Sequence, residues 1–414
     1  MFSVTSLGFL PFMALFVCLW YRVPQPSRWK LVLAANAVFC LSIDIGALFA
    51  VALATAVVWQ AAQHAQPEQP SRRGWLALGL AAALLPLLVL KYSGMLVPGL
   101  RDLYKPFGLA YYSLQLAGYL LDVWHGRTAP TPSYARLWCY AGFFLSLTQG
   151  PFNRYNTLMP QLEAAPKTFE TQRLVSGLQR SAWGYFKKFA IADRAAIVVS
   201  AAFADPASFD RSQLIFATVM YSFQLYADFS GYTDIVLGMG EILGLHLPEN
   251  FRQPFFSASV KELWARWHIS LSQWFRDYVY IPLGGNRVSV LRWCFNMFVV
   301  WLLSGLWHGA GWNFALWGLY FGVFLSAEKL IGKKWKERSF KIADISANND
   351  SNGGDRENMF LTCVRNIIEH GYVLLVVLFS FVIFRVESVR EIKEQLLGLA
   401  GSYGNAMTPM AAYE

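Results

Sequence analysis

Long stretches without a charged side chain constrain the fold of this sequence more than any other feature. Residues 2–21, 45–63 and 309–327 contain no Asp, Glu, Lys or Arg. Each stretch is close to the ~20 residues that a helix needs to cross the hydrocarbon core of a bilayer. Charged residues make up 15% of the chain, whereas soluble domains carry roughly 25%. The sequence therefore predicts an all-α integral membrane protein.

Further apolar runs are shorter than a straight membrane crossing requires. They cover residues 31–43, 74–90, 106–121, 137–153, 212–227, 293–307 and 371–384. Short apolar runs are typical of re-entrant or broken helices that pack inside protein. We therefore expect about nine to eleven membrane-embedded segments.

Basic residues in the loops predict the orientation of the chain. They gather in residues 22–30, after the first apolar run, in residues 72–73, after the third, and in residues 329–341. Because Lys and Arg are enriched in cytoplasmic loops, we expect these segments in the cytoplasm and the N-terminus outside. The net charge of +9 is explained by loops that face anionic lipid, so no nucleic-acid partner is expected.

The sequence shows no separate soluble domain beside the membrane domain, and we expect residues 1–414 to form one membrane domain. We expect N-terminal helices over residues 1–136 and a catalytic core, dense in ionisable and aromatic residues, over 137–330. A basic cytoplasmic loop with a linker is expected over 331–368, and C-terminal helices over 369–414. Residues 342–358 are rich in Asn, Asp, Gly and Ser, which predicts a flexible surface connection.

Residues 261–280 have the composition of an amphipathic helix, KELWARWHISLSQWFRDYVY. Helical spacing pairs Glu262 with Arg266, and the large apolar surface predicts a helix at the membrane interface or dipping into the bundle. Residues 281–287, IPLGGNR, end this helix with proline and paired glycine. The two glycines favour a plain turn over a phosphate-binding nest.

His308 is the strongest single candidate for chemistry. It lies between the apolar runs 293–307 and 309–327, and an ionisable group at that depth indicates function. Gly305 and Gly309 form a small-xxx-small pair that lets another backbone approach, so we expect the imidazole to line a tight cavity. Imidazole suits proton transfer near neutral pH. A buried histidine bonded to a backbone carbonyl fits the composition equally well.

His268 is the second candidate, because a histidine between Trp267 and Ser270 could orient a substrate or share proton transfer. An interfacial histidine hydrogen-bonded to a neighbour is the alternative. Asp228 and Asp234 are six residues apart and do not share a helical face. They are expected to bond to backbone or arginine. The sequence has no CxxC pair, P-loop, zinc motif or G-x-S-x-G, so we expect no metal and no bound cofactor.

Four blocks in order resemble the membrane-bound O-acyltransferase (MBOAT) family. They are GPFNRY (150–155), FQLYADFSGYTDI (223–235), NFRQPFFSASVKELWARWHISLSQWFRDYVYIPLGGNR (250–287) and LSGLWHGAGWNFALWGLYFG (303–322). Within that family the sequence is most similar to the AlgI-like branch, which serves alginate O-acetylation, and more distantly to DltB. The YIPLGGNR ending favours the AlgI-like branch.

The resemblance implies a ring of tilted, broken and re-entrant helices around a central funnel. It implies that His308, in the WHG motif, is catalytic and that His268, in the RWHISLS motif, is the second polar site. The other residues expected along the substrate channel are Trp267, Trp274, Trp307, Trp312, Tyr226, Asp228, Ser304, Arg276, Asp277 and Asn286. AlgI-like proteins continue beyond the segment that matches residues 379–392, so further terminal helices are expected in longer relatives.

The implied reaction moves an acyl group, most commonly acetyl, from a cytoplasmic thioester donor such as acetyl-CoA toward an extracytoplasmic polysaccharide such as alginate. The implied partner is an extracytoplasmic SGNH-type or AlgJ/AlgX-like acetyltransferase. The implied location is the cytoplasmic (inner) membrane of a bacterium. Alternatives are DltB-like transfer of D-alanine or another acyl group to a cell-wall polymer, a transporter without acyl chemistry, and a scaffold that recruits a soluble transferase.

Overall fold

The computed structural model describes residues 3–100, 103–166, 168–346 and 354–401. The chain divides into two compact units. The first contains Met1–Arg194 and Phe223–Asn250, and the second contains Ala195–Ser222 and Phe251–Glu414. In both units the described backbone forms helices and connecting turns, and its one isolated β-bridge pairs Phe251 with Trp267.

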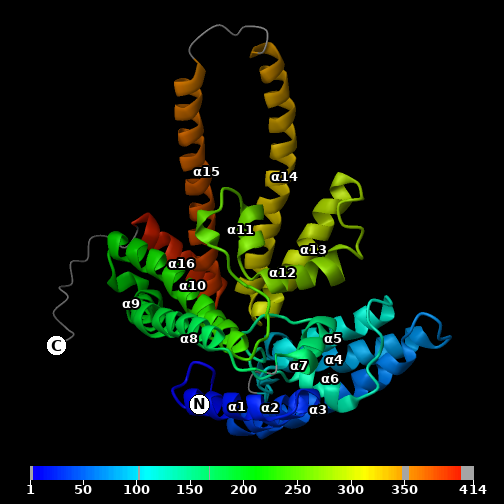
Figure 1. Cartoon of the computed structure of the whole chain (residues 1–414). Coiled ribbons are helices and arrows are strands. Elements are labelled where there is room, and N and C mark those ends of the chain that lie inside the picture. The colour runs from blue at the N-terminus through cyan, green and yellow to red at the C-terminus, as the bar shows by residue number, and fades with distance from the viewer. Residues whose placement is uncertain (1–2, 101–102, 167, 347–353, 402–414) are drawn as a thin grey trace, which may run out of the picture. The chain divides into compact units, whose positions relative to one another are not determined.

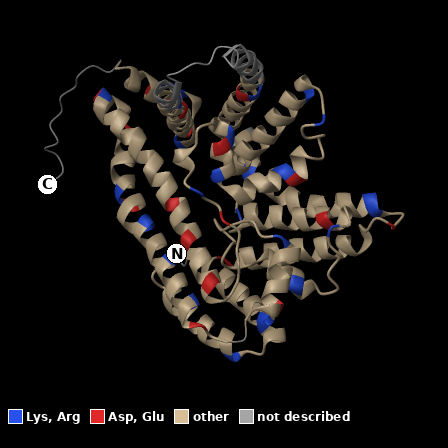
Figure 2. Ribbon diagram, turned by 45° about the horizontal axis from the view of Figure 1, so that its top comes forward, with Lys and Arg blue, Asp and Glu red and all other residues tan. Residues whose placement is uncertain are grey.

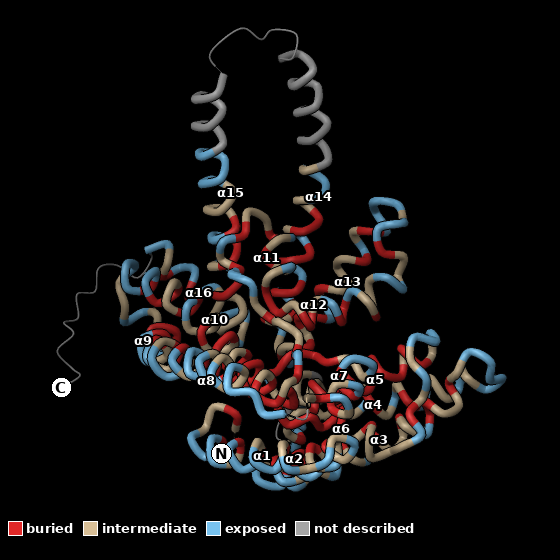
Figure 3. Tube along the Cα trace, viewed as in Figure 1, coloured by how far each residue is buried: buried red, intermediate tan, exposed pale blue. Residues whose placement is uncertain are grey.

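Among its described residues, the first unit has eight complete α-helices and the second part of another. They are α1 (Phe9–Arg22), α2 (Arg28–Ile43), α3 (Ile45–His64), α4 (Arg72–Leu96), α5 (Leu109–Trp124), α6 (Tyr134–Ala141), α7 (Tyr155–Ala164), α8 (Thr171–Phe186) and the C-terminal part of α10 (Arg211–Ile242). A π-helical turn, Lys187–Ala192, follows α8. Nearly every residue of α5 is buried, so this helix forms the core of the unit (Figure 3).

Residues 142–154, directly after α6, are non-helical yet largely buried. The amide side chain of Asn36 secures them: it donates to the carbonyl oxygen of Cys139 at 2.9 Å and accepts from the backbone amide of Phe144 at 2.9 Å. Irregular backbone is tolerated at membrane depth only where protein or water satisfies it. The apolar run 137–153 is therefore a broken segment packed inside protein, as its length predicted.

The second unit carries the remaining helices. They are most of α9 (Asp193–Ala204), the first part of α10, α11 (Val260–Arg266), α12 (Ile269–Phe275), α13 (Val290–His308), α14 (Trp312–Ser346), α15 (Gly354–Arg385) and α16 (Val389–Ala400). A π-helical turn, Arg276–Tyr280, follows α12. Helices α14 and α15 run side by side in Figure 1 and contact each other.

Within the described residues, five helices are long and apolar enough to cross a membrane. These segments are Ile45–His64, Arg72–Met95, Val290–His308, Trp312–Gly332 and Cys363–Arg385. Lys, Arg, Asp and Glu residues are sparse along the helical ribbons (Figure 2). The prediction of an all-α, multi-pass membrane protein is confirmed. The total of nine to eleven embedded segments also counts shorter apolar runs and stays a prediction, as do the ring and its central funnel.

Two expectations for local structure were wrong. The predicted helix over residues 261–280 is broken after Arg266, because His268 adopts a left-handed backbone conformation with φ of 45°. The predicted loop over 342–358 is helical at both ends, since α14 ends at Ser346 and α15 begins at Gly354. Once a helix has formed, each further residue adds a backbone hydrogen bond, so α14 and α15 extend into the polar residues that predicted a loop. Residues 347–353 lie outside the described part of the chain.

Candidate active site

The break between α11 and α12 places His268. The backbone amide of Arg252 donates to the carbonyl oxygen of Arg266 at 2.9 Å, and this bond forms part of the bridge between Phe251 and Trp267. The extended Trp267 thus leaves the helix, and His268 then turns the chain at φ of 45°. Such a conformation is uncommon for a residue other than glycine and is concentrated at functional sites.

The two candidate histidines meet in the second unit. The ring centroids of His268 and His308 are 6.1 Å apart, and Trp307 lies 6.0 Å from His268. His268 is 1% exposed, whereas His308 is partly exposed. His268 lies outside the five spanning-length helices, and burial, followed by the charge of His308, lowers its pKa well below the usual value of 6.5. His268 is therefore neutral at physiological pH.

Aromatic rings surround the imidazole of His308. Trp317 of α14 and Phe384 of α15 pack against it in T-shaped contacts, with centroid distances of 5.3 and 5.4 Å. The preceding Trp307 lies at 5.0 Å. Sequence reasoning missed Trp317 and Phe384, because they reach His308 from other helices and nothing in their local sequence distinguishes them from core aromatics.

Glycines allow α13 and α14 to approach closely beside His308. A Cβ atom at Gly305 would lie 2.2 Å from the carbonyl oxygen of Phe314, and one at Gly318 would lie 2.2 Å from that of Trp301. The predicted close backbone approach is confirmed at Gly305. At Gly309 the neighbour is instead the side chain of Phe314, whose ring would lie 1.9 Å from an added Cβ atom.

The other predicted channel residues of the second unit occupy several environments. Trp267 packs on Phe381 at 5.7 Å, and Trp274 on Tyr278 at 5.1 Å. Ser304 is 8% exposed and lies one turn before His308 on α13. Trp312 begins α14 and is 64% exposed.

The remaining polar candidates of this unit follow α12. Arg276 donates from Nε to the carboxylate of Asp277 at 2.8 Å. The side-chain oxygen of Asn286 accepts from the hydroxyl of Tyr280 at 2.7 Å and from the ammonium of Lys329 at 3.2 Å. The two contacts of Asn286 tie the turn at residues 281–287 to Tyr280 and Lys329. Gly284 and Gly285 of this turn have positive φ, and the helical segment ends before it as predicted.

The candidates Tyr226 and Asp228 lie on α10 in the first unit, beside a partly buried ionic network. The ammonium of Lys188 contacts the carboxylate of Asp228 at 2.6 Å. Lys187 lies over the ring of Tyr226, with its Nζ atom 5.9 Å from the centroid. The expected ion pair with arginine is found at Asp234 rather than at Asp228.

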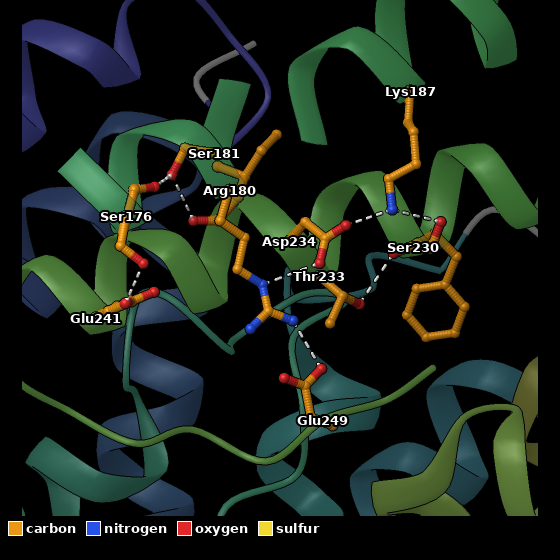
Figure 4. Close-up of polar contacts among 12 residues, drawn as sticks. Ser176, Arg180, Ser181, Lys187, Ser230, Thr233, Asp234, Glu241 and Glu249 are labelled. Atoms are coloured by element: carbon orange, nitrogen blue, oxygen red, sulfur yellow. Dashed lines mark hydrogen bonds and ion pairs between the residues drawn. The ribbon is translucent and has the colours of Figure 1, made fainter. Parts of the chain in front are cut away.

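Asp234 is the centre of this network, which Figure 4 shows. Arg180 donates to Asp234 at 3.1 Å and to Glu249 at 2.7 Å, and Lys187 pairs with Asp234 and donates to Ser230 at 3.0 Å. The network joins α8 and its π-helical turn to α10. Among the described residues, no group of three or more His, Cys, Asp or Glu side chains is arranged to hold a metal ion.

Spanning-length helices and two imidazoles brought together among aromatic rings define a multi-pass membrane protein with a candidate acid–base site. Comparison with known proteins gives this class a family. The model of the membrane-bound O-acyltransferase family matches residues 92–347. The chain belongs to this family, and it is an O-acyltransferase.

Individual relatives extend the match over most of the chain. The "Probable alginate O-acetylase AlgI" of Pseudomonas fluorescens is 33% identical over 400 residues, which cover 95% of this chain and 74% of the relative. The peptidoglycan O-acetyltransferase of Helicobacter pylori is 32% identical over 69% of this chain and 60% of the relative. The teichoic acid D-alanyltransferase of Bacillus subtilis is 28% identical over 70% of this chain and 77% of the relative. These similarities favour acyl transfer over the transporter alternative.

Proposed function

We propose that this O-acyltransferase moves an acetyl group from a cytoplasmic thioester, acetyl-CoA, toward a polysaccharide outside the cytoplasmic membrane. Relatives named for O-acetylation of alginate and of peptidoglycan match at 33% and 32% identity, above the 28% of the D-alanyltransferase. The contact between the imidazoles of His268 and His308 supports acid–base chemistry at one site. An alginate-like polymer is the proposed acceptor, reached through an extracytoplasmic acetyltransferase partner of the SGNH or AlgJ/AlgX-like type.

In the proposed reaction His308 is the general base. Its imidazole takes the proton of the attacking hydroxyl, while the hydroxyl oxygen forms a bond to the thioester carbonyl carbon. The carbon–sulfur bond then breaks, and the imidazolium returns the proton to the leaving thiolate, so the products are an ester and a free thiol. General acid–base catalysis of this kind contributes about 10²- to 10⁴-fold.

His268 orients one of the two substrates in this proposal. Its lowered pKa keeps the ring neutral, so one ring nitrogen can donate a hydrogen bond while the other accepts one. The other predicted channel residues of the second unit keep their proposed role as channel lining, and for Tyr226 and Asp228 of the first unit that role stays a prediction from the family resemblance. Holding donor and acceptor together in a confined channel contributes on the order of 7–11 kcal/mol to lowering the barrier.

The direct test is His308→Ala in cells that make the full-length protein. We expect polymer acetylation per molecule of membrane protein to fall by at least about 100-fold. The matched control is His64→Ala, which removes an imidazole at the end of α3, outside the proposed site. Wild-type acetylation in the His308 variant at normal protein level would contradict the assignment.

The donor needs a separate test. Inverted membrane vesicles are supplied with acetyl-CoA labelled in the acetyl group, and label on the polymer or on an extracytoplasmic partner is measured. Label that appears only when an acylated carrier protein replaces acetyl-CoA would reject the donor. Transfer of D-alanine but not acetyl would reject the acyl group.

A further inference from the structure

A carboxylate from one helix holds the start of another in the second unit. Glu328 of α14 accepts hydrogen bonds from the backbone amides of Val260, at 2.6 Å, and Lys261, at 3.0 Å. These amides begin α11, and the first amides of a helix have no partner within it. The side chain of Tyr372, on α15, also interacts electrostatically with Glu328. The carboxylate of Glu328 thus joins α14 to the start of α11.

The local sequence already supplies α11 with a cap of its own. The hydroxyl of Ser259 accepts from the amide of Glu262 at 3.1 Å, and the carboxylate of Glu262 accepts from the amide of Ala258 at 2.8 Å. This pattern resembles a capping box, except that the glutamate accepts from the amide one residue before the N-cap. Glu328 therefore adds hydrogen bonds from another helix to a start that the local sequence already caps, and these bonds attach the start of α11 to α14.

A second contact fixes the direction in which α11 runs along α14. The indole of Trp264 packs against Phe321 at 4.8 Å and against Trp317 at 5.5 Å, and Trp317 packs against His308 at 5.3 Å. From Glu328 to Trp317, α14 rises roughly 16 Å at 1.5 Å per residue. Helix α11 thus runs antiparallel to α14, from Glu328 toward the histidines.

The chain reaches His268 at the end of this run. Val260, Leu263 and Trp267 are buried, so α11 fits its neighbours along one face. A shift of α11 along α14 would move His268 relative to His308, because α14 also packs on His308. A carboxylate within a spanning-length helix is costly unless it is satisfied, and the two amides of α11 satisfy Glu328.

We propose that Glu328 is a positioning residue for acyl transfer. It holds the start of α11 on α14 and so sets the separation of the His268 and His308 imidazoles without touching either ring. The inference rests on the proposed roles of these two histidines. Misplacing a reacting group by about 1 Å can cost about 100-fold in rate, so loss of the attachment should affect turnover rather than donor binding.

The experiment compares Glu328→Gln with Glu391→Gln in the full-length purified protein. Glutamine keeps the length of Glu328 and one acceptor oxygen, but its NH2 group replaces the other oxygen and cannot accept from the second amide. Glu391 accepts the amide of Glu387 at 3.0 Å and caps α16 in the same unit, so it controls for the loss of a capping carboxylate. Turnover, the KM for acetyl-CoA and hydrogen–deuterium exchange of a peptide covering residues 258–275 are measured.

We expect Glu328→Gln to lower kcat by roughly 10- to 100-fold with an unchanged KM, and to speed exchange in residues 258–275. Glu391→Gln should leave kcat unchanged and speed exchange only around α16. Tyr372→Phe, which removes the hydroxyl that interacts electrostatically with Glu328 and keeps the ring, should also lower kcat, but by less. If Glu328→Gln does not accumulate, the kcat of Tyr372→Phe decides the test.

The results separate this inference from the proposed function. An unchanged kcat per folded molecule in Glu328→Gln, or a rise in KM alone, would overturn the positioning role. If accumulation fails and Tyr372→Phe has wild-type kcat, the role is also overturned. If His268→Ala and His308→Ala both turn over at the wild-type rate, the proposed chemistry fails, whatever Glu328 does to exchange.

Discussion

The imidazole of His308 lies against the indole of Trp317, with ring centroids 5.3 Å apart and ring planes at 80°. His308 ends α13 and Trp317 lies in the second turn of α14. The helices are joined by a short turn, so this contact fixes the direction in which the imidazole points. The same indole contacts Trp264, which links the His308 pocket to α11.

Trp317→Leu should therefore lower the rate of acyl transfer. Leucine keeps apolar volume but loses the ring that orients His308, and we expect about a tenfold fall in kcat from the misoriented imidazole. Trp317→Phe should lose less. The control is Trp183→Leu, on α8, whose indole is 56% exposed. Equal kcat values for wild type and Trp317→Leu would show that the ring contact does not hold the imidazole.

The close approach of α13 and α14 gives a prediction about stability. Alanine at Gly305 or Gly318 would put a Cβ atom 2.2 Å from a backbone oxygen of the other helix, so the helices would have to separate. Overpacking typically costs about 1–3 kcal/mol, and we expect a lower melting temperature in detergent. Gly332→Ala is the control on α14, because nothing lies within 4 Å of its added Cβ atom. A melting temperature equal to that of the control would contradict this account.

The ionic network around Asp234 predicts a coupled effect. The side chains of Lys187 and Asp234 are 9% and 18% exposed, and removing one partner of a buried pair typically costs about 3–5 kcal/mol. We expect Lys187→Met to destabilise the protein strongly, and Lys187→Met combined with Asp234→Asn to cost less than the sum of the two single changes. Thermal unfolding of the three variants measures the coupling.

An exposed ion pair provides the comparison for the Lys187 and Asp234 variants. Arg390 pairs with Glu394 on α16 at 2.8 Å, and the side chain of Arg390 is 87% exposed. Exposed pairs of this spacing are worth about 0.3–0.5 kcal/mol, so Arg390→Gln should hardly change the melting temperature. Strictly additive losses at Lys187 and Asp234 would show that their pairing contributes no stability.

His268 predicts a pH dependence of stability. Its pKa in the folded protein lies below the usual value of 6.5, so the unfolded chain binds the proton more tightly. The free energy of unfolding should be highest above about pH 6.5 and fall as the pH drops from there to the folded-state pKa. His268→Asn should flatten this part of the profile. The measurement is the melting temperature in detergent between about pH 7 and about pH 5. An equally steep profile in His268→Asn would assign the effect to another group.

Local patterns predicted several features of the site. The i, i+4 pair of Glu262 and Arg266 is present at 2.5 Å, and the Pro–Gly turn ends the helical segment at Tyr280. Residues within one turn of a helix are neighbours whatever the rest of the chain does. Interactions of this kind are therefore readable from sequence.

The break at His268 was not readable in the same way. Its own residues favour a continuous amphipathic helix, and the break depends on the bridge from Phe251 and the bond from Arg252 to Arg266. These partners lie outside the helix that they interrupt. Tertiary hydrogen bonds can outweigh helix propensity, because propensity differences are below about 1 kcal/mol per residue for most residues.

The sequence by itself determined that this protein is helical and embedded in a membrane. An uncharged stretch of this length lies in lipid as a helix, because the helix hydrogen-bonds the backbone amides and carbonyls that lipid cannot. It also singled out His268 and His308, since an ionisable side chain in apolar surroundings is costly. Only the tertiary structure decided that the two rings lie 6.1 Å apart, with Trp317 and Phe384 around His308 and Glu328 on the start of α11. Contacts between helices depend on how side chains of distant segments pack, and no local pattern encodes that packing.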